Sequence, residues 1–320
     1  MSGLANEPKK FAVIGELNVD LVVIGSQGTA VPGRETIAED ISLTLGSASA
    51  IVACGLARLG NDVTFVSRVG KDDFGRFCLK ALEGRGIRTD QVNVAEGSKT
   101  GVTIALSTGD DRALVTFPGA IAELRYADIP LNILEGKDHL HLTSYYLQSA
   151  LRPDFPRLLD QAKRLGLTNS FDPNTDPKQG RDSKIFDVLE FTDVLFLNEP
   201  ESLLLSGAGD AESAARKLSG YCPMVVIKLG PAGSIAVQDG ELTRSDGFKV
   251  DVVDTTGAGD SFAAGFLHAY HLGAAIGDCL QIANACGALS TRMPGGTDAQ
   301  PSVAEIRGFL KSRESSAAGT

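Results

Sequence analysis

The chain has 320 residues, a length that suits one large α/β domain or one and a half smaller ones. A hydrophobic content of 43% with 22% charged residues is ordinary for a globular protein that buries a sizeable core. The formal net charge of −10, without any cluster of Lys and Arg, argues against a nucleic-acid-binding surface, although one local site can still bind an anion.

The cysteines and the apolar segments indicate where the protein works. Five cysteines are scattered without a C-x-x-C pair, which is typical of reduced core thiols and disfavours a metal cluster. The polar residues 1–10 lack the apolar centre of a signal peptide, and no apolar run approaches the ~20 residues that span a bilayer. We therefore predict a cytoplasmic protein that does not contact membranes. The small, polar residues 312–320 are predicted to fray.

The first elements in chain order are a buried strand and a polar continuation of it. Residues 11–15 form a short apolar run that ends at glycine, and residues 16–24 alternate between apolar and polar side chains. Asn18 and Asp20 lie two residues apart, so they point the same way on an extended chain. They could bind a polyol together, or they could form an Asx turn.

Further β segments predict a lid beside the main sheet. Residues 37–45 alternate again after a segment rich in Gly, Pro and polar residues. Two later strands, 100–106 and 113–117, are joined by Ser107-Thr108-Gly109-Asp110-Asp111, which is a hairpin signal. We expect these segments to build a small β lid from about 16–45 and 98–120.

The remaining pattern alternates between strands and helices. Such alternation predicts a parallel sheet covered by helices on both faces, with ligands at the carboxyl ends of the strands. No internal repeat or long linker is visible, so residues 1–320 are predicted to form a single domain, a Rossmann-like α/β sandwich with the lid attached. The predicted strands are 63–69, 139–142, 168–172, 194–197 and 224–229, followed by an antiparallel pair, 234–237 and 241–250. The predicted helices are 47–59, 73–83, 153–165, 184–190, 199–205, 211–218, 259–271, 275–292 and 302–312.

Residues 254–262, D-T-T-G-A-G-D-S-F, predict an anion site with an acid beside it. Glycines let backbone N–H groups approach an anion, and a helix that starts there adds unpaired donors and a positive dipole end. An acid in that position is reasonable if the anion is a transferring phosphoryl group and Asp260 takes the proton of the attacking hydroxyl. The alternative is an ordinary N-cap aspartate after a glycine turn.

Other phosphate-binding signatures are absent from the sequence. The Gly-Lys pairs at Gly70-Lys71 and Gly136-Lys137 are followed by Asp, so neither is a Walker loop. The third position of a dinucleotide motif after Gly257-x-Gly259 is Phe262, and the motif lies late in the chain. The protein-kinase motifs are also missing.

The 254–262 stretch resembles the C-terminal signature of the ribokinase-like carbohydrate kinases, the phosphofructokinase-B type family. Weaker matches follow in the family's order along nearly the whole chain. They are Gly15-x-x-Asn18-x-Asp20, Leu56-Ala57-Arg58-Leu59-Gly60, Val69-Gly70-x-Asp72-x-Phe74-Gly75, Asp172-Pro173-Asn174, Asn198-Glu199-Pro200-Glu201 and Lys228-Leu229-Gly230-x-x-Gly233.

The resemblance implies a phosphotransferase that moves the γ-phosphoryl group of ATP to a hydroxyl of a sugar-like acceptor. Asp260 would be the base, and the N–H groups of Gly257, Ala258 and Gly259 would hold the charge that builds on the phosphoryl oxygens. The predicted acceptor-binding residues are Asn18, Asp20, Gly46 and Ser47. The predicted ATP-binding residues are Asn198, Lys228, Gly230, Gly233 and Asn284. Lys228 could instead be an exposed lysine, and Asn284 a helix-surface asparagine.

The resemblance also implies metal ions. Glu201 would organise Mg²⁺ through water, with the substrate phosphates completing the coordination. Asp254 and Thr256 would help to hold a monovalent cation such as K⁺, together with carbonyl groups near Gly295-Gly296. The alternative for Asp254 is a turn cap.

Three residues depart from the family pattern on the acceptor side. The family usually has Gly-Gly before the first helix and Asn five residues after the first of these glycines, where this chain has Gly46-Ser47 and Ile51. After Pro118-Gly119-Ala120 an Asn is common, and here Ile121 follows. Because a site built to hydrogen-bond a hydroxyl discriminates by that bond, the acceptor cannot be copied from ribokinase.

Three functions remain open from the sequence. The leading one is a sugar kinase whose acceptor is unspecified, and the second is a nucleoside kinase. The third is a non-catalytic nucleotide-binding protein on the same fold, against which the intact Asp260 and its glycines argue. An exposed edge of the lid could also pair between two chains, which would give a homodimer.

Overall fold

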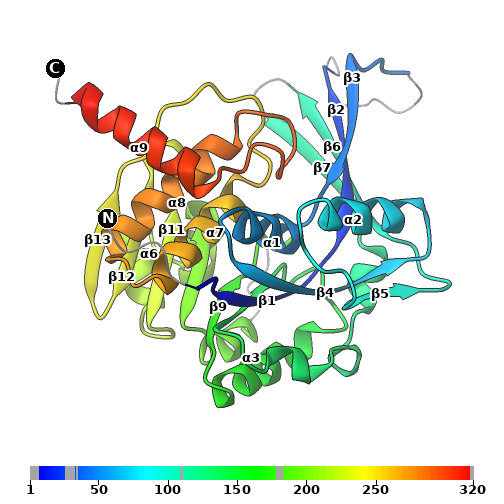
Figure 1. The fold of residues 1–320 in the computed structure, drawn as a ribbon, viewed down its shortest axis with the longest axis horizontal. Coiled ribbons are helices and arrows are strands. Elements are labelled where there is room, and N and C mark those ends of the chain that lie inside the picture. Colours follow the sequence, from blue (N-terminus) through cyan, green and yellow to red (C-terminus); the bar gives the residue numbers. More distant parts are fainter. Residues whose placement is uncertain (1–6, 26–32, 34, 109–110, 178–182, 318–320) are drawn as a thin grey trace.

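The computed structural model describes residues 7–25, 33, 35–108, 111–177 and 183–317. Two sheets carry the architecture (Figure 1): a nine-stranded sheet in the order β13-β12-β11-β10-β9-β8-β1-β4-β5 and a four-stranded sheet in the order β3-β2-β6-β7. The strands are β1 (Lys10–Ile14), β2 (Asn18–Ile24), β3 (Asp40–Leu45), β4 (Asp62–Gly70), β5 (Val92–Ala95), β6 (Gly101–Thr108), β7 (Asp111–Phe117), β8 (His139–Thr143), β9 (Thr168–Asp172), β10 (Val194–Asn198), β11 (Met224–Lys228), β12 (Ser234–Gln238) and β13 (Glu241–Ser245). The helices are α1 (Ala48–Arg58), α2 (Asp73–Glu83), α3 (Phe155–Arg164), α4 (Ile185–Leu189), α5 (Glu199–Ser206), α6 (Ala211–Leu218), α7 (Ala258–His271), α8 (Ile276–Ser290) and α9 (Val303–Ala317).

The large sheet is parallel except at the edge formed by β12 and β13. Its central strand β1 is buried on both faces: Phe11 and Val13 belong to one core, and Ala12 and Ile14 to the other. Helices α1, α2, α7 and α8 lie on one side of the sheet and α3 on the other (Figure 1). This arrangement explains the unbroken apolar strands of the sequence, because both of their faces meet helices, and it confirms the predicted α/β class.

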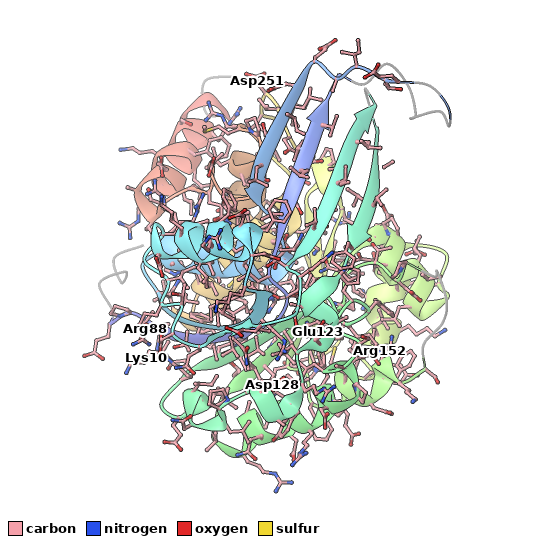
Figure 2. The ribbon with its side chains drawn as sticks, turned by 90° about the vertical axis from the view of Figure 1, so that its right-hand side faces the viewer. Lys10, Arg88, Glu123, Asp128, Arg152 and Asp251 are labelled. Atoms are coloured by element: carbon pink, nitrogen blue, oxygen red, sulfur yellow. The ribbon has the colours of Figure 1, made fainter. Side chains whose placement is uncertain are left out.

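The four-stranded sheet is built from the segments predicted for the lid. In Figure 2 its strands rise to the top of the molecule, and β2 and β3 contact α2. Cross-strand partners point to the same side of a sheet. The register therefore places one polar row, Thr44-Asp20-Thr103-Thr116, on one face. It places an apolar row, Leu43-Leu21-Ile104-Val115, on the other face. Leu43, Ile104 and Val115 are exposed by 39%, 38% and 59%.

Three details differ from the sequence prediction. The strand β5 was not expected, because two of its four residues are exposed and the apolar pattern is weak. The strand predicted over 241–250 ends at Ser245, where the chain turns so closely that a Cβ on Gly247 would lie 2.3 Å from the Pro231 carbonyl oxygen. The fraying predicted from residue 312 is wrong up to Ala317, because α9 continues and the Arg313 guanidinium donates to the Lys249 carbonyl at 2.7 Å. The predicted turn at Gly109-Asp110 and residues 318–320 lie outside the described residues.

None of the helices in the described ranges is both long and apolar enough to cross a bilayer. All five cysteines are buried and carry free thiols.

Three histidines form a buried cluster at the end of the sheet opposite the strand carboxyl termini. Ser170 Oγ lies 2.6 Å from His139 Nε2 and 2.6 Å from His141 Nδ1, and His271 Nε2 lies 3.0 Å from His139 Nδ1. Burial lowers the pKa of His141 and His271 to about 4 and lowers the pKa of His139 well below its ordinary value. The folded protein therefore keeps these rings neutral.

The histidine cluster should make stability depend on pH. Between about pH 6.5 and pH 4 the unfolded chain binds protons that the folded chain refuses, so the free energy of unfolding should fall as the pH falls through this window. A His271→Asn variant should lose up to about 1.4 kcal/mol per pH unit of that dependence. Urea unfolding at several pH values measures it. If the free energy of unfolding changed equally with pH in the variant and the wild type, the cluster would not titrate as described.

Candidate active site

The predicted anion site is the N-terminus of α7. Its N-cap Gly257 has φ of 71°, and a Cβ there would lie 2.7 Å from Gly296 Cα and 3.0 Å from Ile51 Cγ2, so only glycine fits. The N–H of Ala258 donates to the Thr255 carbonyl at 3.2 Å, so that donor of the predicted anion site is already engaged, and Gly259 lies against the Lys228 side chain. The helix start therefore presents a glycine-lined positive end, as an anion site requires.

Lys228 brings a positive charge to this helix start. It ends β11, and its Nζ lies 2.7 Å from Oδ2 of Asp172, which ends β9. The two side chains are only 14% and 2% exposed, and a Cβ on Gly259 would lie 3.2 Å from Lys228 Nζ. Burial alone would lower the pKa of Lys228, but the carboxyls of Asp172, Glu201 and Asp260 outweigh it and raise that pKa. Lys228 is thus a charged residue of the site and not an exposed surface lysine.

Asp260 lies in the first turn of α7, beyond the cap. Gly257 occupies the N-cap position and no side chain caps this helix, so Asp260 is not the N-cap aspartate that the sequence left open. Removal from water raises the pKa of Asp260 to about 7, with Lys228 lowering it and the carboxyls of Asp172, Glu16 and Glu201 raising it. A carboxyl group with a pKa near the working pH can both accept and release a proton efficiently.

On the acceptor side, Asn18 and Asp20 lie together in β2 and not in a turn. Asn18 Nδ2 donates to Asp20 Oδ1 at 3.0 Å and to Thr103 Oγ1 at 3.2 Å. Gly46 covers them so closely that a Cβ would lie 2.1 Å from Asp20 Oδ1 and 2.8 Å from Asn18 Nδ2. The structure thus brings three of the four predicted acceptor residues together.

Ser47, the fourth predicted acceptor residue, is engaged in local structure. It has φ of 80° and caps α1: its Oγ accepts from the Ala50 N–H at 3.3 Å and donates to the Glu16 carbonyl. Of the two isoleucines that depart from the family pattern, Ile51 packs against Gly257 and Gly296. Ile121 lies beside Gly101 next to Asn18, so its apolar side chain faces the acceptor side.

Gly46→Ala should weaken acceptor binding selectively. The added methyl group overlaps Asp20 and Asn18, so we expect the KM of the acceptor to rise by about tenfold or more with little change in ATP binding. Gly308→Ala is the matched control, because nothing lies within 4 Å of that Cβ and alanine favours the helix. Steady-state kinetics of both variants measures the effect. An unchanged KM in Gly46→Ala would remove Gly46 from the acceptor site.

The predicted nucleotide residues Asn198 and Glu201 form a capping box on α5. Asn198 Oδ1 accepts from the Glu201 N–H at 2.8 Å, and Glu201 Oε2 accepts from the Asn198 N–H at 2.9 Å. The other oxygen of Glu201 accepts from Thr175 Oγ1 at 2.8 Å. Burial and the nearby Asp172 carboxyl raise the pKa of Glu201. The carboxylate is therefore held in place at the edge of the site.

The remaining nucleotide-side residues shape one loop. Gly233 has φ of 96°, and a Cβ there would lie 2.1 Å from the Ser245 carbonyl oxygen; Gly230, with φ of 58°, begins the same turn. Asn284 on α8 is buried, and its Nδ2 donates to the Ser245 and Asp246 carbonyls, each at 3.2 Å. Asn284 therefore points into the protein and is not a helix-surface asparagine.

Asp254 and Thr256 organise the approach to α7. Asp254 Oδ1 accepts from the N–H and Oγ1 of Thr256 at 2.9 and 2.7 Å, and Asp254 Oδ2 accepts from the Gly295 N–H at 2.8 Å. Within the described ranges, no three His, Cys, Asp or Glu side chains are grouped as a metal site. A cation bound beside Asp254 would therefore rest mainly on backbone carbonyls, which suits K⁺ better than a transition metal.

Sequence reasoning missed a second acid, Glu16, which lies between β1 and β2 and is 2% exposed. Its partners Ser49, Thr143 and Ser144 come from α1 and from the carboxyl end of β8. The available signal was an acidic residue directly after a buried strand and its terminal glycine, Gly15. Polar residues at that place in a parallel sheet commonly face a ligand.

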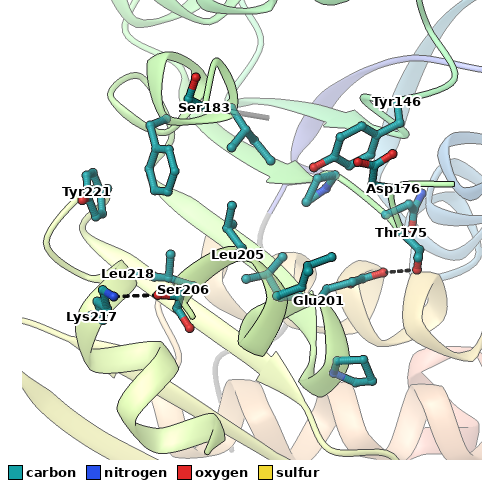
Figure 3. Close-up of a pocket in the computed structure, with 17 residues that line it drawn as sticks. Tyr146, Thr175, Asp176, Ser183, Glu201, Leu205, Ser206, Lys217, Leu218 and Tyr221 are labelled. Atoms are coloured by element: carbon teal, nitrogen blue, oxygen red, sulfur yellow. Dashed lines mark hydrogen bonds between the residues drawn. The ribbon is translucent and has the colours of Figure 1, made fainter. Parts of the chain in front are cut away.

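A cavity of about 510 Å³ adjoins the site (Figure 3). Thr175 and Glu201 line one end of it, where the Thr175–Glu201 hydrogen bond is drawn; Lys217 and Ser206 line the other end. Leucine, isoleucine and phenylalanine side chains make up much of the remaining lining. Two residues link the cavity to the site: Glu201, and Asn174, whose N–H donates to Asp172 Oδ1 at 3.2 Å.

A phosphoryl-binding helix start, an internal cation and an acid at the carboxyl edge of a parallel sheet define a phosphotransferase site. Residues 8–303 match the sequence model of the family described as "pfkB family carbohydrate kinase", so the chain belongs to this family. It is 32% identical over 282 residues to the 2-dehydro-3-deoxygluconokinase of Bacillus subtilis, covering 84% of this chain and 87% of that protein. It is 32% identical over 310 residues to a fructokinase of Klebsiella pneumoniae, covering 91% and 96% of the two chains.

Solved structures agree with this family. A crystal structure from E. coli, provisionally assigned as a ribokinase II, superposes with a TM-score of 0.85 at 28% identity, covering 96% of this chain and all of that one. A Vibrio cholerae fructokinase double mutant with fructose, ADP and potassium bound superposes with a TM-score of 0.79 at 26% identity, covering 96% and 99%. The fold is therefore ribokinase-like, and the chain is a phosphotransferase that acts on a sugar hydroxyl.

Proposed function

We propose that this chain is an ATP-dependent sugar kinase in which Asp260 is the base. The observation that carries the proposal is the position of Asp260, with a pKa near 7, beside Lys228 at a glycine-started helix. The nucleotide is inferred from relatives: a 26%-identical structure from E. coli contains ATP and Mg²⁺, and the fructokinase structure contains ADP.

The reaction follows from these positions. Asp260 takes the proton of an acceptor hydroxyl, the hydroxyl oxygen bonds to the γ-phosphorus, and the bond between that phosphorus and the β-bridging oxygen breaks to release ADP. The backbone N–H groups of Gly257 and Gly259, with the charge of Lys228, stabilise the negative charge on the transferring group. Because these donors are fixed before the substrate arrives, little reorganisation accompanies the step.

Two ion sites are part of the proposal. The fixed carboxylate of Glu201 fits a role in holding Mg²⁺ through water, and Mg²⁺ would neutralise phosphate charge. Asp254 and Thr256, with the loop at Gly295-Gly296, would hold a monovalent cation, as the potassium in the fructokinase structure supports.

The acceptor is proposed to bind along the polar row of the lid. Asp20 and Asn18 lie beside Thr103, whose Oγ1 is 3.2 Å from Thr116 Oγ1. Thr44 Oγ1 is buried without a hydrogen-bond partner among the described residues. Several hydroxyl groups and one carboxylate in a row are suited to a polyol, which offers several hydroxyls of its own.

Further features remain proposals about the whole protein. The exposed apolar row of the lid, Leu43-Leu21-Ile104-Val115, supports a homodimer through the lid. A cytoplasmic location is proposed from the reduced cysteines, which are all buried.

ADP release measured against about 50 acceptors, both sugars and nucleosides, tests the function across the substrate class. We expect turnover with at least one neutral sugar or polyol. Turnover confined to nucleosides would replace the sugar kinase with a nucleoside kinase, and no turnover with any acceptor would favour a non-catalytic nucleotide-binding protein.

A further inference from the structure

Glu16 is a buried acid with an unusual set of partners. It accepts four hydrogen bonds: from the N–H and Oγ of Ser49 at 3.2 and 2.5 Å, from Thr143 Oγ1 at 2.9 Å and from Ser144 Oγ at 2.6 Å. In the described part of the chain, no Lys, Arg or His lies within ion-pair distance of it. A carboxylate with only 2% exposure is therefore stabilised by neutral donors and by the N-terminus of α1.

These bonds fix the segments that surround the acceptor. Ser49 belongs to the first turn of α1, two residues after its N-cap Ser47, while Thr143 ends β8 and Ser144 follows it. Glu16 itself precedes Asn18 by two residues. One carboxylate thus joins β2, α1 and β8 at the place where the acceptor hydroxyl must meet Asp260.

A hydrogen-bonded path continues from Glu16 to the reacting centre. Asn174 Nδ2 donates to Ser144 Oγ at 2.7 Å, and the Asn174 N–H donates to Asp172 Oδ1 at 3.2 Å. Asp172 in turn pairs with Lys228, which lies beside Gly259. Hydrogen bonds and one ion pair thus connect Glu16 to Lys228 through Ser144, Asn174 and Asp172.

Acidic side chains outnumber cationic ones among the charged groups that face Asp260. Four charged groups face it from the elements packed around the site: Lys228 from β11, Asp172 from β9, Glu201 from α5 and Glu16 from the β1–β2 junction. Lys228 is the one cation among these four, and it is shared with Asp172. The carboxylate of Glu16 thus adds negative potential at Asp260 that no cation of its own cancels.

We propose that Glu16 is a positioning residue for phosphoryl transfer, which keeps Asp260 a stronger base through its charge and fixes the acceptor segments through its four hydrogen bonds. This inference rests on the proposed function and adds a residue to it. Glu16 does not touch the reacting atoms; it acts through Asp260, Ser49 and Ser144.

The test is the pH dependence of kcat/KM for the acceptor. In the wild-type enzyme we expect kcat/KM to fall at low pH as Asp260 takes up a proton. This falling part of the pH profile is its acid limb. In Glu16→Gln, which keeps the shape and removes the charge, the limb should move to lower pH by roughly 0.5 to 1 pH unit, because a lost negative charge makes Asp260 easier to ionise. The plateau rate should fall by about threefold, because the base is then weaker.

Two control variants separate charge from structure. Glu16→Asp keeps the charge, so its limb should stay at the wild-type pH even if shortening the side chain lowers the rate. Thr143→Val removes one hydrogen bond and keeps the charge, and its limb should not move to lower pH. Thermal unfolding shows whether each variant is folded.

Every outcome bears on the proposal. An active Glu16→Gln enzyme with an unmoved limb would overturn the role of Glu16 and leave the kinase assignment intact. If Glu16→Gln does not fold, the proposal is still open to refutation, because a limb that moves to lower pH in the charge-keeping Glu16→Asp would overturn the role of the charge. A wild-type chain that releases no ADP with any acceptor would overturn the proposed function itself.

Discussion

Replacing Asp260 by Asn should reduce phosphoryl transfer by about 10²-fold or more while ATP still binds. Asparagine keeps the shape of the side chain but cannot take the proton of the acceptor hydroxyl. It also removes one of the negative charges that face Lys228, so ATP affinity should be unchanged or higher. The comparison of ADP release with calorimetric ATP binding separates chemistry from binding.

Asp278→Asn is the matched control for this experiment. Asp278 is an exposed acid in the first turn of α8, so the same substitution removes a charge at the same place on a neighbouring helix. We expect its turnover to equal that of the wild type. An Asp260→Asn enzyme within a few-fold of wild-type turnover would exclude Asp260 as the base.

The second large effect should come from Lys228→Met. This change leaves Asp172 buried without its cation, and breaking a buried ion pair costs about 3–5 kcal/mol of stability. It also removes the positive charge next to Gly259, so phosphoryl transfer should fall by about 10²-fold or more. Urea unfolding and ADP release measure the two losses.

Controls distinguish the two roles of Lys228. Arg164→Met breaks the exposed pair with Asp160 on α3, and this should cost about 1 kcal/mol or less. Combining Lys228→Met with Asp172→Asn should restore much of the stability, because Asp172 is then no longer a buried carboxylate that has lost its ion-pair partner, but should not restore the activity. If the double variant regained both, Lys228 would serve only as the partner of Asp172.

The glycine-started helix with an acid in its first turn could be predicted from the sequence because it lies in one continuous stretch. Gly257, Gly259 and Asp260 are neighbours along the chain, and their proposed roles follow from the properties of glycine and of helix starts. The strands of the large sheet were equally readable, since both of their faces are apolar. Strand β5 was missed because local composition does not reveal a short, half-exposed edge strand.

What the sequence could not provide was contact between distant segments. Glu16 meets Thr143 and Ser144 across more than a hundred residues, and Lys228 meets Asp172 across 56 residues. Nor did the motifs reveal that Asn198 and Glu201 would serve as a helix cap, or that Asn284 would hold a loop. A residue can carry a family signature and a structural task at once, and only the hydrogen bonds show the second.

The short connection between β1 and β2 bears on how the acceptor preference of this protein can be altered by substitution. Only Gly15, Glu16 and Leu17 separate a central strand of the large sheet from a strand of the small one. The residues proposed to recognise the acceptor lie on the small sheet. Of the residues proposed for phosphoryl transfer, Lys228 ends β11 of the large sheet and Asp260 lies on α7, which packs against that sheet. Substitutions on the polar face of the small sheet can therefore exchange one acceptor for another without disturbing the transfer chemistry. For an enzyme engineer, this face is the place to randomise and the three-residue connection is the place to leave untouched.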